Sequence, residues 1–219
     1  MPAPVSEAIR AAKTRVERDI GTPGLGKLLK AYFDPACGFA GAMFDTLGAN
    51  PRNEITRDDL LAVTLLDVRW SPSAVRRLLG DDAKQATELL AGITSVKNLW
   101  EVSEEKLAAT DPLWRLLTKG SDGVGQTRAS KLLARKRPRL VPITDSIIVG
   151  RVGAIGETWQ ALRYCLQDAS LRQAIKALRP QQAGTASVLR LLDVALWMLH
   201  SQSKAARKAR DTAGVTPER

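Results

Sequence analysis

The sequence predicts an all-α protein built from many helices. Apolar residues recur at three- and four-residue spacing along nearly the whole chain, and no segment alternates apolar and polar residues as a half-buried strand does. Residues that favour helix caps precede the periodic segments, and glycine or proline separates them. With 219 residues, of which 44% are hydrophobic and 26% charged, the chain is long enough to bury a substantial core.

The expected helices can be assigned in order along the chain. Ser6 can cap a first helix that continues through Asp19, and Thr56 with Asp59 forms an acidic capping box before an apolar run. Pro72 occupies the favoured first position of a later helix. The periodicity predicts helices over 6–19, 26–33, 60–68, 73–79, 83–93, 104–110, 112–119, 126–136, 145–152, 157–167, 170–179 and 185–201.

The composition along the chain indicates one helical domain over residues 1–203, with a possible division into two lobes. A stretch rich in glycine, asparagine and proline at 48–53 marks the boundary. One lobe then comprises 56–155, and the other comprises 1–55 together with 156–203. Residues 204–219 are basic and are expected to form a disordered tail.

The scarcity of cysteine and histidine argues against metal sites and against nucleophiles activated by histidine. The only cysteines, Cys37 and Cys165, are far apart and lack metal-ligand spacing, and the only histidine, His200, lies in an apolar helix. We therefore expect no metal, no cofactor and no nucleophile activated by histidine. No apolar run approaches 18 residues and no secretion leader is recognisable, so we expect a soluble, cytoplasmic protein without a membrane partner.

The charge of the chain favours a polyanionic partner. The 33 lysine and arginine residues exceed the 23 acidic residues, which gives a formal net charge of +10. Six of these basic residues lie between 126 and 139, a segment without a single acidic residue. Such a concentration of positive charge is typical of a surface that contacts nucleic acid.

The basic segment begins at a glycine turn between two expected helices. Gly123 and Gly125 flank one apolar residue, so the backbone can turn tightly and approach a ligand closely. The free N–H groups that begin the following helix can bind a phosphate. The alternative is an ordinary helical hairpin whose glycines only turn the chain. The binding interpretation assigns the contacts to Gly123, Gly125, Gln126, Thr127, Arg128, Lys131, Arg135, Lys136 and Arg137.

The spacing around this turn resembles the helix-hairpin-helix DNA glycosylases. Gly123-Val124-Gly125 is followed by Ala129 and, twenty residues after Gly125, by Asp145. The resemblance implies that Asp145 is catalytic, that it stabilises the positively charged sugar and that it helps water to attack as a flipped base leaves. The lysine of the bifunctional members falls at Thr127, so the implied enzyme is a monofunctional N-glycosylase. The histidine that often follows the aspartate is replaced by Ile147.

The segment Leu132–Pro142 and the rest of the chain also look like an uncharacterised bacterial family of small, basic, helical proteins, and that likeness implies no activity. Asp145 also has a structural explanation, because aspartate is a preferred N-cap and an apolar run follows it. Three functions therefore remain. The first is sequence-independent binding of nucleic acid, foremost double-stranded DNA. The second is base excision with Asp145, and the third is a helical domain that binds protein partners of unknown identity.

Overall fold

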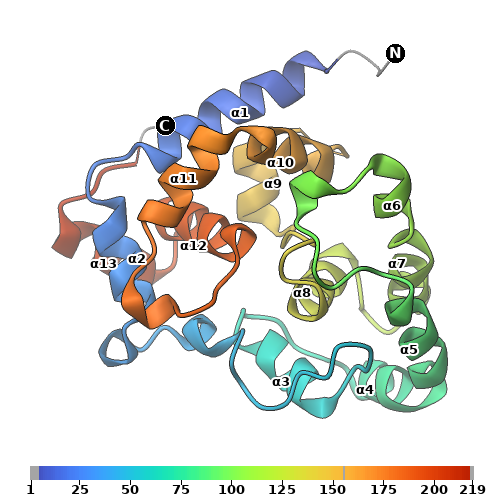
Figure 1. Ribbon diagram of the computed structural model, residues 1–219. Helices are drawn as coiled ribbons and strands as arrows, with labels where there is room; N and C mark the ends of the chain where they lie inside the picture. The colour runs from blue at the N-terminus through green and yellow to red at the C-terminus, as the bar shows by residue number, and fades with distance from the viewer. Residues whose placement is uncertain (1–4, 155, 218–219) are drawn as a thin grey trace. The chain divides into compact units, whose positions relative to one another are not determined.

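A computed structural model describes residues 5–154 and 156–217, and every regular element within them is helical (Figure 1). The chain divides into two compact units, Met1–Phe39 with Thr144–Arg219 and Ala40–Ile143. The predicted all-α fold is confirmed. The lobe boundary differs from the predicted one, because the stretch at 48–53 lies inside the second unit and does not link two lobes.

The first unit is formed by the two ends of the chain. Its elements are α1 (Glu7–Ile20), α2 (Leu25–Phe33), η1 (Pro35–Cys37), α9 (Ser146–Val152), α10 (Thr158–Gln167), α11 (Ala169–Ala177), η5 (Gln181–Ala183), α12 (Val188–His200) and α13 (Lys204–Ala213). Helix α12 is the centre of this unit, since most of its side chains are buried and it contacts α1, α2, α9, α11 and α13. An almost wholly apolar helix of this kind can only be stable inside a core.

The second unit is formed by the middle of the chain. Its elements are η2 (Ala40–Met43), α3 (Arg57–Thr64), α4 (Pro72–Arg76), the π-helical turn η3 (Arg77–Asp81), α5 (Ala83–Ala91), η4 (Leu99–Glu101), α6 (Glu104–Ala108), α7 (Asp111–Thr118) and α8 (Gln126–Lys136). Helix α8 contacts α3 and α7, and every residue from Ala129 to Lys136 is buried. The helix predicted to carry exposed positive charge is therefore the core helix of this unit.

The predicted caps account for where several helices begin. Ser6 caps α1, and Thr56 and Asp59 form the expected capping box at α3. Ser71 caps α4, with Pro72 in its first turn. The helix expected over 73–79 is different, because α4 ends at Arg76 and the chain continues through the π-helical turn η3.

The C-terminal segment corrects the expectation of a disordered tail from residue 204. Helix α13 is capped by Ser203, buries Ala206, and packs on α12 and α2. The guanidinium of Arg210 donates to the carbonyl oxygens of Met198 at 2.6 Å and Ser201 at 2.9 Å, which lie at the end of α12. These contacts fix α13 to the first unit, although its basic composition predicted a solvent-exposed, disordered segment. Residues 218–219 lie outside the described part of the chain.

An ion-pair cluster joins α1, α9 and α12 in the first unit. Arg151 donates to both carboxylate oxygens of Asp19 at 2.6 and 2.8 Å, and Nε2 of His200 lies 3.1 Å from Oδ1 of Asp19. Burial by itself would raise the pKa of Asp19, but the contacts with His200 and Arg151 lower this pKa below its ordinary value of 3.8.

Acid is expected to weaken the first unit through Asp19. Because the folded protein holds the pKa of this carboxyl below that of the unfolded chain, its contribution is complete above about pH 4 and is lost as the pH falls through the folded pKa. Urea unfolding between pH 2 and 6 should therefore show a smaller fall in the free energy of unfolding for Asp19→Asn than for wild type. Equal pH dependence of the two proteins would show that this cluster contributes nothing to acid sensitivity.

Candidate nucleic-acid interface

The glycine turn joins α7 to α8, as the sequence predicts. Gly123 has a φ of 83°, a left-handed conformation that favours glycine. Gly125 is the N-cap of α8, and its N–H donates to the carbonyl of Gly123 at 3.0 Å. Because glycine offers no side chain to accept from the first turn, no side-chain cap protects the N–H groups that begin this helix. The start of α8 therefore has the chemistry of an anion site.

Arg77 fixes the position of this turn. Its guanidinium donates to the Asp122 carboxylate at 2.7 Å and to the carbonyl oxygens of Leu116 and Leu117 at 2.9 and 2.8 Å. Asp122 in turn accepts from the N–H of Val124 at 3.2 Å. The guanidinium of Arg77 holds the pKa of Asp122 below its usual range, so the carboxylate stays charged at neutral pH.

An open concavity of about 510 Å³ lies beside the turn. It is formed by the segment after α3 and by the start of α8, and its lining consists of Asp67, Val68, Arg69, Gly123, Gly125, Gln126, Thr127 and Arg128. Five of the nine residues predicted to contact nucleic acid therefore share one hollow. Asp67 has a φ of 58°, which is the one left-handed conformation of a non-glycine residue in the described ranges 5–154 and 156–217.

Two arginines of different exposure line this concavity. Arg69 is exposed, whereas Arg128 is partly buried and donates through Nη1 to the carbonyl of Gly123. Nε of Arg128 is buried and has no hydrogen-bond partner among the described residues. Asp67 adds one exposed negative charge, so the two arginines leave a small positive excess at the start of α8. The hollow can thus present two guanidinium groups and helix N–H groups to an anion.

Four of the predicted contact residues are not at this surface, and their assignment to phosphate binding is corrected. Lys131, Arg135, Lys136 and Arg137 are between 1% and 7% exposed. Lys131 donates to the carbonyl of Leu66 at 2.8 Å, which holds the segment that leads into the concavity. Their side chains point into the second unit because α8 is packed on more than one side, and a buried cation must satisfy its donors within the protein.

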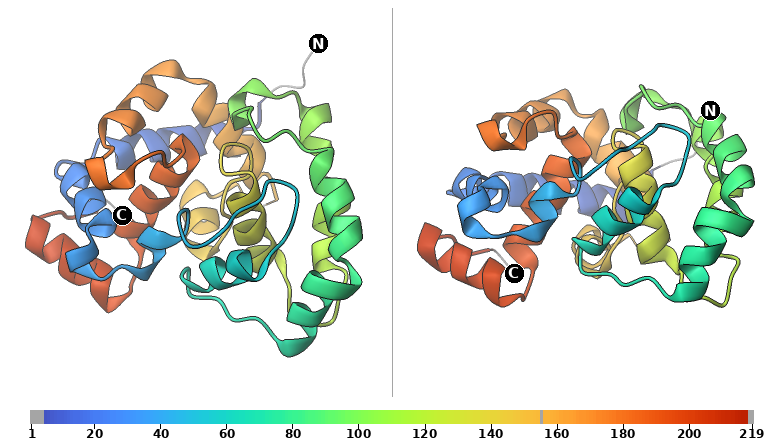
Figure 2. Two further views of the ribbon diagram at one scale, coloured as in Figure 1. Left: turned by 60° about the horizontal axis from the view of Figure 1, so that its bottom comes forward. Right: turned by 90° about the horizontal axis from the view of Figure 1, so that it is seen from below.

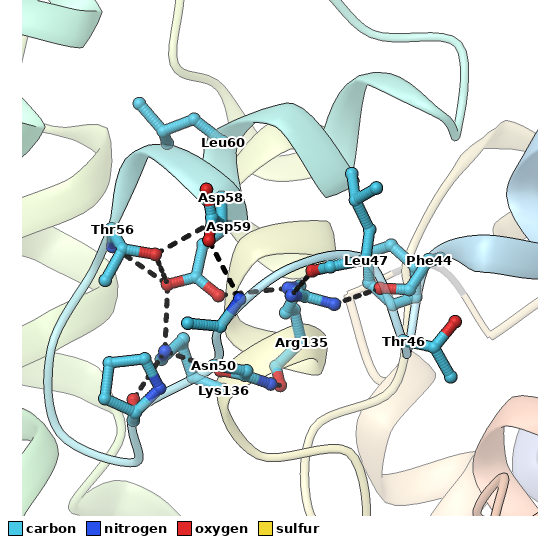
Figure 3. A network of polar contacts seen from close by, with 12 residues as sticks. Phe44, Thr46, Leu47, Asn50, Thr56, Asp58, Asp59, Leu60, Arg135 and Lys136 are labelled. Atoms are coloured by element: carbon cyan, nitrogen blue, oxygen red, sulfur yellow. Dashed lines mark hydrogen bonds and ion pairs between the residues drawn. The ribbon is translucent and has the colours of Figure 1, made fainter.

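Asp59 forms ion pairs with two of these buried cations, Arg135 and Lys136 (Figure 3). Its Oδ1 accepts from Nε of Arg135 at 3.0 Å and its Oδ2 accepts from Nζ of Lys136 at 2.9 Å, with the side chains of all three residues fully buried. Both cations also bind the loop that precedes α3, which passes over α8 (Figure 2). The acceptors in that loop are the carbonyl oxygens of Phe44, Leu47 and Pro51 and Oδ1 of Asn50.

Uncharged oxygen atoms of the described residues accept the hydrogen bonds of Arg137. It donates to the carbonyls of Ile93 at 3.0 Å and Arg52 at 2.6 Å, to the carbonyl of Leu90, and to Oδ1 of Asn53 at 3.0 Å. The three consecutive cations 135–137 thus bind segments that lie 44 to 91 residues away in sequence. The sequence pattern of α8 does not predict these contacts. Lysine and arginine side chains are usually exposed, and the segments that bury them here are distant in sequence.

Asp145 is the N-cap of α9 in the first unit. Its Oδ1 accepts from the N–H groups of Ile147 at 3.1 Å and Ile148 at 3.0 Å. The capping role that the sequence offered as an alternative is therefore confirmed, and it explains the carboxylate without catalysis. A catalytic role for Asp145 stays a prediction.

Several residues of the site were not found by sequence reasoning. Arg69 and Asp67 follow α3 and reach the turn only through the fold. Asp122 could have been noticed, because aspartate before a Gly-X-Gly turn often accepts from a nearby backbone N–H. In the described ranges, no group of three or more histidine, cysteine or acidic side chains could hold a metal ion. Burial raises the pKa of Cys165 to about 12, which keeps that thiol protonated.

Taken together, these features define an all-helical protein whose second unit carries a glycine turn beside a hollow lined by two arginines. Residues 25–200 match the model described as Family of unknown function (DUF6308), and the chain belongs to that family. This finding agrees with the likeness to an uncharacterised family of helical proteins. No curated protein and no solved structure matches the chain. The resemblance to DNA glycosylases stays a prediction.

No helix in the described residues is both long and apolar enough to cross a membrane.

Proposed function

We propose that this protein binds nucleic acid without sequence preference, with double-stranded DNA as the foremost partner, through the concavity beside the glycine turn. The proposal is supported by one observation above all. The uncapped start of α8 and the guanidinium groups of Arg69 and Arg128 line the same open hollow. N–H groups and arginines contact the phosphates and sugars that all nucleic acids share, so such contacts position a strand without reading its bases.

The size of the hollow limits the electrostatic contribution of this contact. With two arginines available, the site neutralises about two phosphates, which corresponds to a contribution of about −1.8 to the slope of log affinity against log salt concentration. The other basic residues of α8 add nothing to this slope, because they are buried.

Reversing the charge of Arg69 tests the proposal. Arg69→Glu should weaken binding of a 20-base-pair duplex roughly tenfold at 0.1 M salt and should reduce the salt slope by about 0.9, measured by fluorescence anisotropy. Arg57→Glu makes the same charge change at a side chain that is 91% exposed and does not line the concavity. Equal losses in the two variants, or no loss in either, would remove the concavity as the contact site.

The two other functions lack a specific observation in their favour. The capping contacts of Asp145 account for its position without a catalytic role. For a protein-interaction domain, the exposed large apolar side chains Met43, Leu61, Leu79 and Val96 come from four different segments of the second unit. Single exposed apolar residues are normal on protein surfaces.

A further inference from the structure

The excess positive charge of the chain is concentrated in the unit that does not contain the glycine turn. The first unit has 17 lysine and arginine residues against 10 acidic residues, an excess of 7, whereas the second has 16 against 13, an excess of 3. Four cations of the second unit are the buried residues Lys131, Arg135, Lys136 and Arg137. Most of the net positive charge that could attract a polyanion therefore lies in the first unit.

Helices α2 and α13 carry a large part of this exposed charge and pack side by side (Figure 1). Five cations are exposed on them, namely Lys27 and Lys30 on α2 and Lys204, Arg207 and Lys208 on α13. None of these five side chains makes a hydrogen bond or ion pair with another residue of the described ranges 5–154 and 156–217. The only acidic residue within either helix is Asp211.

The two helices are fixed firmly to the unit. A Cβ on Gly24, at the start of α2, would come within 2.8 Å of a side-chain methyl of Val215, just after α13, so that side chain packs directly on the backbone of Gly24. Arg210 ties α13 to the end of α12 through two carbonyl oxygens. A backbone held in this way is already ordered, so binding a polyanion costs conformational entropy mainly in the exposed side chains.

We infer that α2 and α13 form a second surface for the phosphate backbone of nucleic acid, separate from the concavity. The chemistry favours nucleic acid over an anionic membrane. A helix that lies in a membrane interface presents a face of large apolar side chains to the lipid, but the apolar residues of α13 are all alanines, and Ala206 is buried within the unit. The exposed large hydrophobic side chains identified among the described residues all belong to the second unit. This inference does not depend on the concavity.

The double variant Lys204→Glu with Lys208→Glu tests the surface. Both side chains are exposed and lie one helical turn apart, and Lys204 lies in the first turn of α13, where Glu is favourable. We expect the variant to bind a 20-base-pair duplex at least tenfold more weakly at 0.1 M salt, with the salt slope reduced by about 1.8. The matched control is Lys97→Glu with Lys106→Glu, which makes the same charge change at exposed positions of the second unit.

The outcomes separate this inference from the proposed function. Equal losses in the two double variants would show a response to net charge alone and would overturn the inference, as would unchanged binding in both. Weaker duplex binding in the α13 variant together with unchanged binding in Arg69→Glu would support the α2–α13 surface and reject the concavity. Weaker binding in Arg69→Glu together with unchanged binding in the α13 variant would support the concavity and reject the α2–α13 surface. Sedimentation with phosphatidylserine vesicles, without binding to the duplex, would identify a membrane as the partner and overturn the assignment to nucleic acid.

Discussion

Asp59→Asn is expected to lower the free energy of unfolding by about 3–5 kcal/mol, the range for removing one partner from a buried ion pair. The substitution keeps the size of the side chain and an oxygen that can accept from Thr56 at the start of α3. It removes the carboxylate charge that pairs with Arg135 and Lys136, both of which would remain buried. Urea unfolding at pH 7 measures this loss.

Asp58→Asn is the matched control for this prediction. Asp58 is the neighbouring carboxylate, it is partly exposed, and it accepts from the N–H of Ala49 at 2.8 Å. We expect a loss of at most about 1 kcal/mol, as for one partly exposed hydrogen bond. Similar losses in the two variants would show that burial of the ion pair has no special energetic consequence.

The pH dependence of the Asp59→Asn variant gives an independent signature. Burial lowers the pKa of Lys136 below its ordinary value of 10.5, and the carboxylate of Asp59 opposes this shift. The unfolded chain therefore holds that proton more tightly, and the free energy of unfolding rises as the pH increases from the folded pKa towards 10.5. Without Asp59 the folded pKa falls further, so we expect this rise to begin at a lower pH than in wild type.

Arg77→Met should have the second largest effect, about 3 kcal/mol, because it removes a mostly buried cation from charged partners. The side chain of Arg77 is 13% exposed, and its loss leaves the carboxylates of Asp82 and Asp122 and two carbonyls at the end of α7 without this donor. Its neighbour Arg76 is 82% exposed and pairs with Asp81 at 3.4 Å. Arg76→Met should change stability by less than about 0.5 kcal/mol, and equal effects of the two variants would contradict the prediction.

The same variant should loosen the glycine turn. Arg77 holds Asp122, and Asp122 accepts from the N–H of Val124 inside the turn. Amide hydrogen exchange at Val124 and Gly125 should therefore accelerate in Arg77→Met beyond the change caused by global destabilisation. Because Arg77 keeps the pKa of Asp122 low, stability should also fall less steeply below about pH 4 in this variant. Unchanged exchange at the turn would show that Arg77 stabilises the unit without positioning the turn.

The buried cations change how the composition of this protein is interpreted. A run such as Arg135-Lys136-Arg137 normally indicates an exposed electropositive surface, and here the run ties α8 to distant loops. The formal charge of +10 therefore overstates the positive charge near the glycine turn. The remaining exposed cations are the ones that a test of nucleic-acid binding should address.

Local signals in the sequence predicted a large part of the helical fold. Ser6, the capping box of Thr56 and Asp59, and Pro72 mark helix starts because each acts on backbone groups within a few residues. The turn at Gly123 and the capping side chain of Asp145 were found for the same reason. Each of these features depends on residues that are neighbours in sequence.

The helical class, the order of the helices and the glycine turn could all be predicted from local sequence, because caps, turns and apolar periodicity act over one or two helical turns. Which basic residues reach a surface could be seen only in the folded protein. Burial depends on which segments pack together, and Lys136 meets Asp59 across 77 residues of chain. The tertiary structure likewise brought Arg69 to the turn and packed α13 on α2, so the surfaces available to a partner differ from those that charge alone predicted.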